Sequence, residues 1–126
     1  MTALCHGIDL VEIARIDQMV NDHGERFLGR VFTHHEREYA IAGGRQQAER
    51  LAARFAAKEA VVKAIGTGLT SAMTWTDIEV RTLASGAPSL VLSGRVAQLA
   101  AEQSITWWRI SLSHAGGFAM ASVIGG

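Results

Sequence analysis

The chain has 126 residues, of which 48% are hydrophobic and 19% charged, and its twelve Lys or Arg side chains balance twelve Asp or Glu side chains. This length and apolar content predict one compact domain over residues 1–126 and exclude a disordered chain. A formal charge of zero argues against broad binding of nucleic acid, because such binding needs a surface that neutralises many phosphates. A local basic patch for one acidic partner remains compatible with this balance.

The sequence lacks the features that direct a chain out of the cytoplasm. Its one cysteine, Cys5, cannot form an internal disulfide, and its apolar surroundings predict a buried, inert thiol. The segment MTALCHGIDLVEIAR has no basic region followed by a long apolar one, as a signal peptide would. No run approaches the roughly 18 apolar residues of a membrane span. We therefore expect a soluble, cytoplasmic protein without a membrane partner.

In the N-terminal third, residues 3–13 form an apolar, partly β-branched run that predicts a buried strand with Asp9 inside it. A helix should follow and end at Gly24, since four apolar residues share one helical face: Ile13, Ile16, Met19 and Val20. Thr-His-His-Glu at 33–36 has the spacing of a capping box. It predicts a short helix that the glycine pair 43–44 breaks.

The best helix signal covers residues 45–65, which are rich in Ala, Arg, Glu, Gln, Leu and Lys, and Gly66 supplies a stop. The remaining elements are expected as a hairpin over 75–94, a short helix over 96–102, and a second antiparallel pair from 106–113 and 118–124. No repeat or linker interrupts them. The pattern predicts one α+β domain with an antiparallel sheet packed against a long helix.

Asp9 is the first candidate for chemistry. A carboxylate inside an apolar strand is costly to bury unless it is hydrogen-bonded or binds a cation. Local sequence favours a hydrogen-bonded aspartate and leaves open a second interpretation, an oxygen ligand for Mg²⁺. That ion usually takes one or two carboxylates together with water and substrate phosphates.

Glu59 and Lys63 stand at i and i+4, and such pairs usually lie on solvated helix faces. Their neighbourhood favours a functional role. Arg54, Lys58 and Lys63 place three cations on one helix, and Gly-Thr-Gly at 66–68 permits a ligand to approach closely. A metal carboxylate beside cations is what phosphoryl chemistry requires.

His114 lies in SLSHAGGF, where a strand gives way to a glycine turn. There it can contact a phosphate or move a proton near neutral pH, or be an ordinary turn residue. His34 and His35 are adjacent on their helix and make a poor metal clamp. The chain has no P-loop, no dinucleotide fingerprint, no Gly-x-Ser-x-Gly elbow and no cysteine pairs for zinc.

Three segments, GIDLVEIARI, RFAAKEAVVKAIGTG and SLSHAGGFAMASV, resemble in order and separation those of the holo-[acyl-carrier-protein] synthase family of small bacterial 4′-phosphopantetheinyl transferases. The likeness runs from roughly Ile8 to Val123, with weaker agreement at Thr33-x-x-Glu36-x-x-Tyr39 and at WTDIEV followed by GAPSLVL. It implies the single domain of that transferase family. It also implies Mg²⁺-dependent transfer of phosphopantetheine from coenzyme A to a serine of apo acyl carrier protein in fatty-acid synthesis, with release of adenosine 3′,5′-bisphosphate.

The resemblance also assigns residues. Asp9 and Glu59 would hold Mg²⁺ against the coenzyme pyrophosphate, and Lys63 would contact the phosphates and could protonate the departing one. The implied coenzyme contacts are Arg54, Phe55, Lys58, Gly66, Thr67, Gly68 and His114. Arg15 would help to hold the acidic carrier, although acidic residues interrupt the first helix here. A metal-bound water, Glu59 or Asp9 could each take the serine proton.

Enzymes of this family are typically homotrimers with active sites at subunit interfaces. Asp9 and His114 would then come from one chain and the 54–68 helix from its neighbour. Alternatively, the site residues would be divided between the chains in some other way. Two alternatives belong to other classes: a non-catalytic module that binds coenzyme A or a nucleotide, and a structural oligomer without ligand. Two carboxylates converging near phosphates would favour the enzyme, because a binder needs only the cations.

Overall fold

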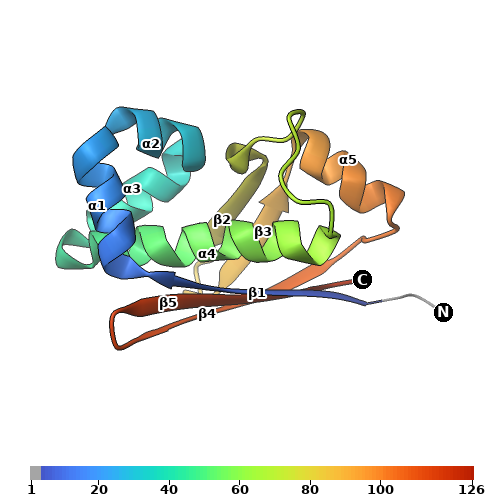
Figure 1. Ribbon diagram of the computed structural model, residues 1–126. Coiled ribbons are helices and arrows are strands. Elements are labelled where there is room, and N and C mark those ends of the chain that lie inside the picture. Colours follow the sequence, from blue (N-terminus) through green and yellow to red (C-terminus); the bar gives the residue numbers. More distant parts are fainter. Residues whose placement is uncertain (1–3) are drawn as a thin grey trace.

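The computed structural model describes residues 4–126, in which one long helix packs on an antiparallel sheet and runs along its strands (Figure 1). The elements are, in chain order, β1 Cys5–Glu12, α1 Ile13–His23, α2 Glu25–Val31, α3 His34–Ala42, η1 Gly44–Gln46, α4 Gln47–Ile65, η2 Trp75–Asp77, β2 Ile78–Thr82, β3 Pro88–Leu92, α5 Gly94–Glu102, β4 Trp108–Ala115 and β5 Phe118–Gly125. The predicted α+β fold is confirmed. Within residues 4–126, no helix combines the length and the apolar character needed to cross a membrane.

The strands form two antiparallel sheets, one of three strands in the order β1-β5-β4 and one that pairs β2 with β3. Both hairpins were predicted from the alternating segments around their turns. The pairing of β1 with β5 was not predicted, because it joins the two ends of the chain. In this register Asp9 lies opposite Ala121, and Ala121 lies opposite Leu112.

Helix α4 can lie close to the sheet because small residues line the contact. Its Ala56, Ala57 and Ala60 are fully buried, and β5 contributes the buried Ala121. At Gly7 the contact is closest, since a Cβ atom there would lie 1.8 Å from the carbonyl oxygen of Ala60. A side chain at this position would therefore push β1 off the helix. Asp9 follows two residues later on the same face of the strand.

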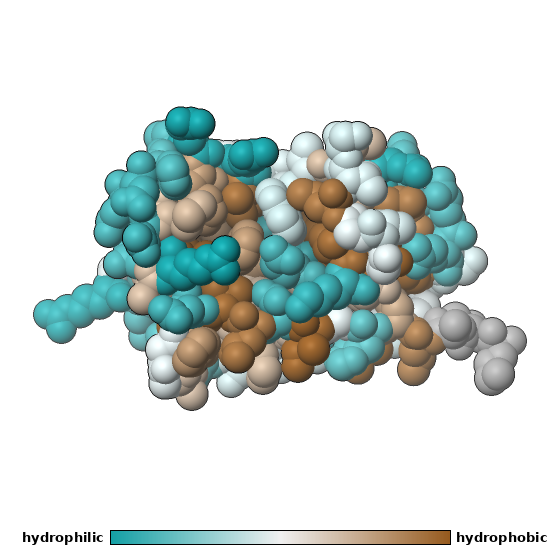
Figure 2. Space-filling model, viewed as in Figure 1, coloured by the Kyte–Doolittle hydropathy of each residue, from teal (hydrophilic) through white to brown (hydrophobic). Residues whose placement is uncertain are grey.

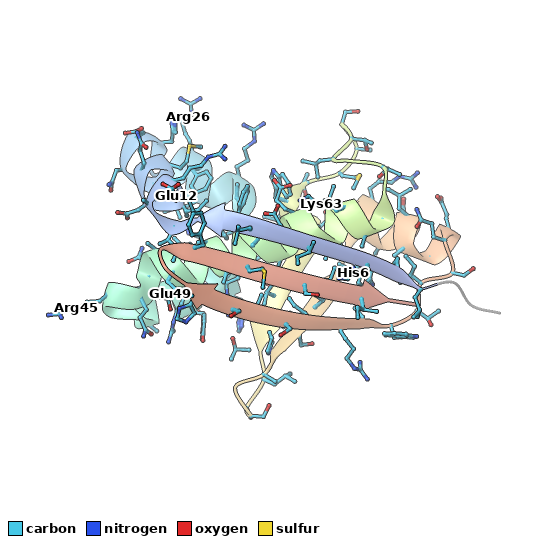
Figure 3. All side chains as sticks on the ribbon, turned by 60° about the horizontal axis from the view of Figure 1, so that its bottom comes forward. His6, Glu12, Arg26, Arg45, Glu49 and Lys63 are labelled. Atoms are coloured by element: carbon cyan, nitrogen blue, oxygen red, sulfur yellow. The ribbon has the colours of Figure 1, made fainter. Side chains whose placement is uncertain are left out.

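Strand β1 alternates in burial, so the prediction of a buried strand over residues 3–13 is right in position and wrong in burial. Gly7 and Val11 face α4, whereas Ile8 is 48% and Leu10 60% exposed. Cys5 is half-buried rather than buried, and Ala3 lies outside the described residues. β5 continues the outer face with three exposed apolar side chains: Phe118, Met120 and Ile124. Figure 3 views the molecule from this side, and apolar atoms follow β1 along the lower edge of Figure 2.

The helical region before α4 holds one α-helix that was not predicted. Helix α2 begins directly after Gly24, which had been interpreted as a stop, and buries Phe27 and Val31. The capping box of α3 is confirmed: the Thr33 N–H donates to Glu36 Oε1 (2.9 Å), and the Glu36 N–H donates to Thr33 Oγ1 (3.3 Å).

Candidate active site

Lys63 and Asp9 form the central ion pair of the site. Lys63 Nζ donates to Asp9 Oδ1 at 2.9 Å and to the carbonyl oxygen of Ile8 at 3.1 Å. The i,i+4 pair expected between Glu59 and Lys63 is not among the ion pairs of residues 4–126. The close approach at Gly7 brings β1 beneath this turn of α4, and the lysine reaches across to the strand. This pairing raises the pKa of Lys63, first through the hydrogen bond and then through the charge of Asp9.

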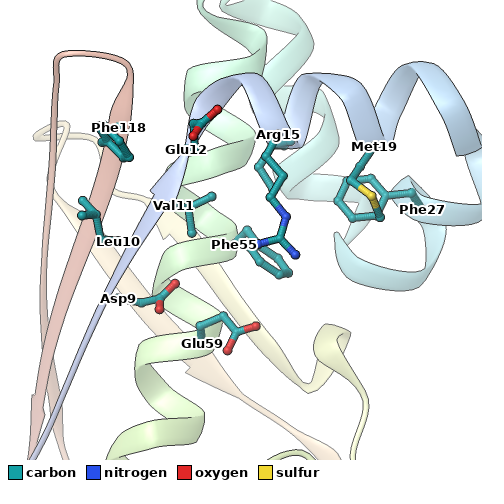
Figure 4. A pocket seen from close by; sticks show the side chains of 11 residues that line it. Asp9, Leu10, Val11, Glu12, Arg15, Met19, Phe27, Phe55, Glu59 and Phe118 are labelled. Carbon is teal, nitrogen blue, oxygen red and sulfur yellow. The ribbon is translucent and has the colours of Figure 1, made fainter.

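Glu59 lies beside this pair, and its carboxylate and that of Asp9 point into one space (Figure 4). Burial raises the pKa of Glu59, and the negative charge of Asp9 raises it further, against the smaller opposing influence of Lys63 and Arg15. A cation placed between the two carboxylates would offset this repulsion at Glu59. The described residues contain no group of three His, Cys, Asp or Glu side chains fit for a metal. The protein would thus supply two carboxylate ligands, a set that fits Mg²⁺ bound also to substrate phosphates.

A cavity of about 440 Å³ opens between β1, α1, α2 and α4 at this point. Its lining includes Asp9, Arg15, Met19, Phe27, Phe55 and Glu59. The guanidinium of Arg15 extends from α1 toward the carboxylate of Glu59 (Figure 4). This side of the site therefore combines two carboxylates with one exposed cation and an apolar wall.

A second cavity of about 540 Å³ lies on the other side of Glu59. Its lining is Glu59, Val62, Lys63, Gly66, Gly68, Leu69 and Trp75. Gly66 and Gly68 have φ angles of 89° and 70°, which favour glycine, so the chain can leave the helix here without side chains that would obstruct a ligand. Thr67 does not line this cavity, and its hydroxyl donates to the carbonyl oxygen of Gly68 at 3.0 Å.

Sequence reasoning missed Trp75. Its ring packs against Phe55, with ring centroids 5.6 Å apart, so Phe55 lines the first cavity and supports a wall of the second. Weak agreement with the family at WTDIEV was the only signal that could have drawn attention to Trp75.

Arg54 and His114 belong to a different cluster, on the β4 side of α4. Arg54 is buried, donates to Thr82 Oγ1 at 3.0 Å and stacks on the ring of Tyr39, which Arg50 also contacts. His114 Nε2 lies 3.1 Å from Glu49 Oε1. A cavity of about 250 Å³ joins these side chains. Its two guanidiniums and one imidazole can bind an anion, and Nε of Arg54 has no hydrogen-bond partner among residues 4–126.

Lys58 does not line any of these three cavities, although it was predicted to line the coenzyme site. Its side chain is fully buried between α4, α3 and the start of β2, where Nζ lies 2.8 Å from Glu36 Oε1. Burial lowers the pKa of Lys58, and Glu36 opposes that effect. The ammonium also donates to two backbone carbonyls, of Trp75 and Ile78.

Within one chain, α4 and the sheet separate the two clusters. Asp9, Glu59 and Lys63 meet at the β1 edge, and Arg54 and His114 meet at the β4 edge. The expectation that Asp9 and the 54–68 helix come from different chains is therefore wrong, because Lys63 contacts Asp9 directly. The other possibility, a different division between subunits, remains open.

Comparison with known proteins identifies relatives of this chain. Residues 6–122 match the model of the 4′-phosphopantetheinyl transferase superfamily. A holo-[acyl-carrier-protein] synthase of Geobacter sulfurreducens is 45% identical over 94% of this chain and 93% of its own length. The crystal structure of the Neisseria meningitidis holo-[acyl-carrier-protein] synthase has a TM-score of 0.86, with 31% identity over 97% of both chains. That of the Helicobacter pylori enzyme in complex with coenzyme A has a TM-score of 0.80, with 30% identity over 96% of this chain and 99% of the other.

The chain belongs to the 4′-phosphopantetheinyl transferase superfamily. It is an enzyme of the phosphopantetheinyl transferase class, and its predicted resemblance to the holo-[acyl-carrier-protein] synthases is confirmed.

Proposed function

We propose that the chain transfers the 4′-phosphopantetheine group of coenzyme A to a serine hydroxyl of apo acyl carrier protein, with Mg²⁺ and with release of adenosine 3′,5′-bisphosphate. The observation that carries the proposal is the pair of carboxylates, Asp9 and Glu59, that face one cavity beside the ammonium of Lys63. We further propose that the reaction serves fatty-acid synthesis in the cytoplasm.

Each group in this cluster has a task in such a transfer. Asp9 and Glu59 would hold the cation, which when bound supplies neutralising charge to the coenzyme pyrophosphate. Lys63 is protonated at neutral pH, since its pKa lies above the ordinary value of 10.5 because of its hydrogen bond to Asp9. Its ammonium can contact a phosphate oxygen and donate a proton to the departing phosphate. A non-catalytic binder would use the basic side chains but has no evident use for two facing carboxylates.

The anion-binding cluster at the β4 edge supports an assembly in which neighbouring chains share each site. Coenzyme A carries a 3′-phosphate besides its pyrophosphate, and Arg54 and His114 of a second chain could bind it. The outer face of the three-stranded sheet supports association, because apolar residues are exposed there together: Ile8, Leu10, Phe118, Met120 and Ile124. Such a face favours contact with another copy. We propose a homotrimer in which each site combines Asp9, Glu59 and Lys63 of one chain with Arg54 and His114 of its neighbour.

For the carrier protein we propose the surface next to Arg15. A hollow of about 370 Å³ there is lined by Met19, His23, Arg26, Phe27 and Arg30. Apolar residues beside two arginines suit an acidic helical partner. Acidic residues interrupt this region, but Arg37 already binds the carboxylate of Glu25, which leaves Arg26 and Arg30 to act on the partner.

The proposal is tested by incubating the protein with coenzyme A, Mg²⁺ and a folded apo acyl carrier protein and then measuring the intact mass of the carrier. A gain equal to one phosphopantetheine group is expected. No gain, with both proteins shown to be folded, would overturn the proposal.

A further inference from the structure

Glu36 and Lys58 form an ion pair that no part of the proposed chemistry uses. Both side chains are fully buried, and Lys58 Nζ lies 2.8 Å from Glu36 Oε1. Glu36 accepts hydrogen bonds from two backbone N–H groups, those of Thr33 and Val80, each at 2.9 Å. Lys58 donates to the carbonyl oxygen of Trp75 at 3.1 Å and to that of Ile78. The pair thus links α3, α4 and the start of β2.

A buried ion pair contributes little net stability, because the free-energy cost of removing two charges from water is about as large as the gain from their attraction. This pair differs from an ordinary buried ion pair because it also binds the backbone carbonyl of Trp75. Trp75 follows a segment, residues 66–72, that is exposed throughout, and its side chain lines the cavity that also contains Glu59, Lys63, Gly66 and Gly68. Its ring is packed against Phe55, and its carbonyl is held by Lys58.

Lys58 and Glu59 are neighbours on α4, and their side chains leave the helix about 100° apart. Glu59 faces the cavity from the helix, and Lys58 holds the carbonyl group of Trp75, whose side chain lines the same cavity. Two adjacent residues of α4 therefore determine how far Trp75 lies from the helix: Glu59 lines the cavity, and Lys58 holds the Trp75 backbone. An apolar side chain at position 58 would leave the carbonyls of Trp75 and Ile78 without this donor.

We infer that Glu36 and Lys58 are positioning residues: they fix Trp75 as an apolar wall of the coenzyme A cavity and thereby set affinity for the coenzyme. The inference rests on the proposed function for the identity of the ligand. Val62, Leu69 and Trp75 would contact the apolar parts of the coenzyme, while Lys63 contacts its phosphates. Loss of the pair should weaken coenzyme binding and leave turnover of the bound substrate nearly unchanged.

The test uses a double variant, Glu36→Leu with Lys58→Met, because removing both members together leaves neither charge buried without its partner. With the thermal midpoint close to that of the parent protein, KM for coenzyme A should rise about tenfold while kcat changes less than about twofold. The Kd of coenzyme A, measured by calorimetry without carrier, should rise by the same factor. The matched control is Arg95→Met with Glu102→Leu, an exposed pair on α5, which should change neither constant.

Two further variants separate positioning from general stability. In a Trp75→Leu background the double variant should add nothing to the rise in KM, because the pair acts through Trp75. Glu36→Gln, which keeps the shape of the side chain, should raise KM by less than the double variant does. It replaces the double variant in the test if that variant does not fold. A folded double variant, or a folded Glu36→Gln variant, with the parent KM and Kd would overturn the inference. Additive effects with Trp75→Leu would overturn it as well. Absence of transfer by the parent protein would instead contradict the proposed function, and the Kd comparison would still test the pair.

Discussion

Lys63 on α4 donates a hydrogen bond to Asp9 on β1 at 2.9 Å, so the lysine joins helix to strand, and the alternative of a simple i,i+4 pair with Glu59 does not form within residues 4–126. The contact gathers the three groups that the proposed reaction needs and leaves the carboxylate of Glu59 directed at the cavity (Figure 4). Lys63 itself is about half exposed, so the pair can open to admit phosphates.

Replacing Lys63 by Met should therefore affect chemistry far more than stability. Loss of one positioned charge in an active site typically lowers kcat by about 10²–10³. Because the Lys63 side chain is 54% exposed, its ion pair contributes about 1 kcal/mol or less to the free energy of unfolding. Rates of carrier modification and urea unfolding curves measure the two effects. Arg81→Met, at another exposed cation, is the control and should keep full activity. A Lys63→Met variant with activity within twofold of the parent would remove the lysine from the mechanism.

Mg²⁺ binding should depend on pH through Glu59. Its folded-state pKa is raised above the ordinary value of 4.5, by burial and by Asp9, so in the window above 4.5 the folded protein keeps a proton that the unfolded chain has lost. Without metal this contribution to stability is full below 4.5 and is lost as pH rises through the folded pKa. Metal binding requires the ionised carboxylate. The rise in thermal midpoint caused by Mg²⁺ should thus be larger at about pH 7.5 than at about pH 5.

Glu59→Gln controls this measurement, because it should show little Mg²⁺-dependent rise at either pH. An equal rise at both pH values in the parent protein would show that the metal binds without titrating this carboxylate.

Gly7→Ala should disturb the site through the backbone. The added Cβ would lie 1.8 Å from the carbonyl oxygen of Ala60, so β1 must move away from α4 and carry Asp9 with it. Overpacking of this kind costs about 1–3 kcal/mol, and transfer should fall along with the free energy of unfolding. Gly29→Ala, in α2 with nothing near its added Cβ, is the control and should stabilise by about 0.5–1 kcal/mol. Urea unfolding of both variants measures the difference, and equal effects would contradict the close contact.

The exposed face of β5 should govern assembly. Met120→Asp places a charge amid the apolar residues of the outer sheet face, and we expect sedimentation to shift from a trimer toward a monomer with unchanged circular dichroism. Transfer should be lost, because Arg54 and His114 would no longer meet a neighbour's Lys63. Ile41→Asp, at an exposed apolar residue of α3, should keep both trimer and activity. A monomeric variant with full activity would contradict a shared site.

Local patterns predicted much of this structure. The capping box at Thr33 and the glycine stop at Gly66 depend only on neighbours in sequence, and both form. Burial of Lys58 also had a signal, since it falls on the helical stripe of Leu51, Phe55, Val62 and Ile65, but lysine is rarely buried and its charge argued for a ligand. The strand contact of Lys63 had no local signal, because it depends on how closely Gly7 lets β1 approach α4.

The position of Trp75 was also beyond prediction from local sequence. Its place in the cavity depends on packing against Phe55, twenty positions earlier, and on a hydrogen bond from Lys58. No periodicity within the segment around Trp75 encodes either contact. Local sequence left a Mg²⁺ role open for Asp9, and the proposal that Asp9 and Glu59 share a metal came from the resemblance of GID and KEAVVK to segments of a known family.

The central claim is metal-dependent transfer by the cluster of Asp9, Glu59 and Lys63, and the intact mass of apo acyl carrier protein tests it most directly. The carrier is incubated with coenzyme A and Mg²⁺ together with the parent protein, Asp9→Asn or Glu59→Gln. A gain of one phosphopantetheine group is predicted with the parent alone, while both variants keep the parent's circular dichroism. An equal gain with either variant, or a full gain by the parent in the presence of a chelator, would contradict it.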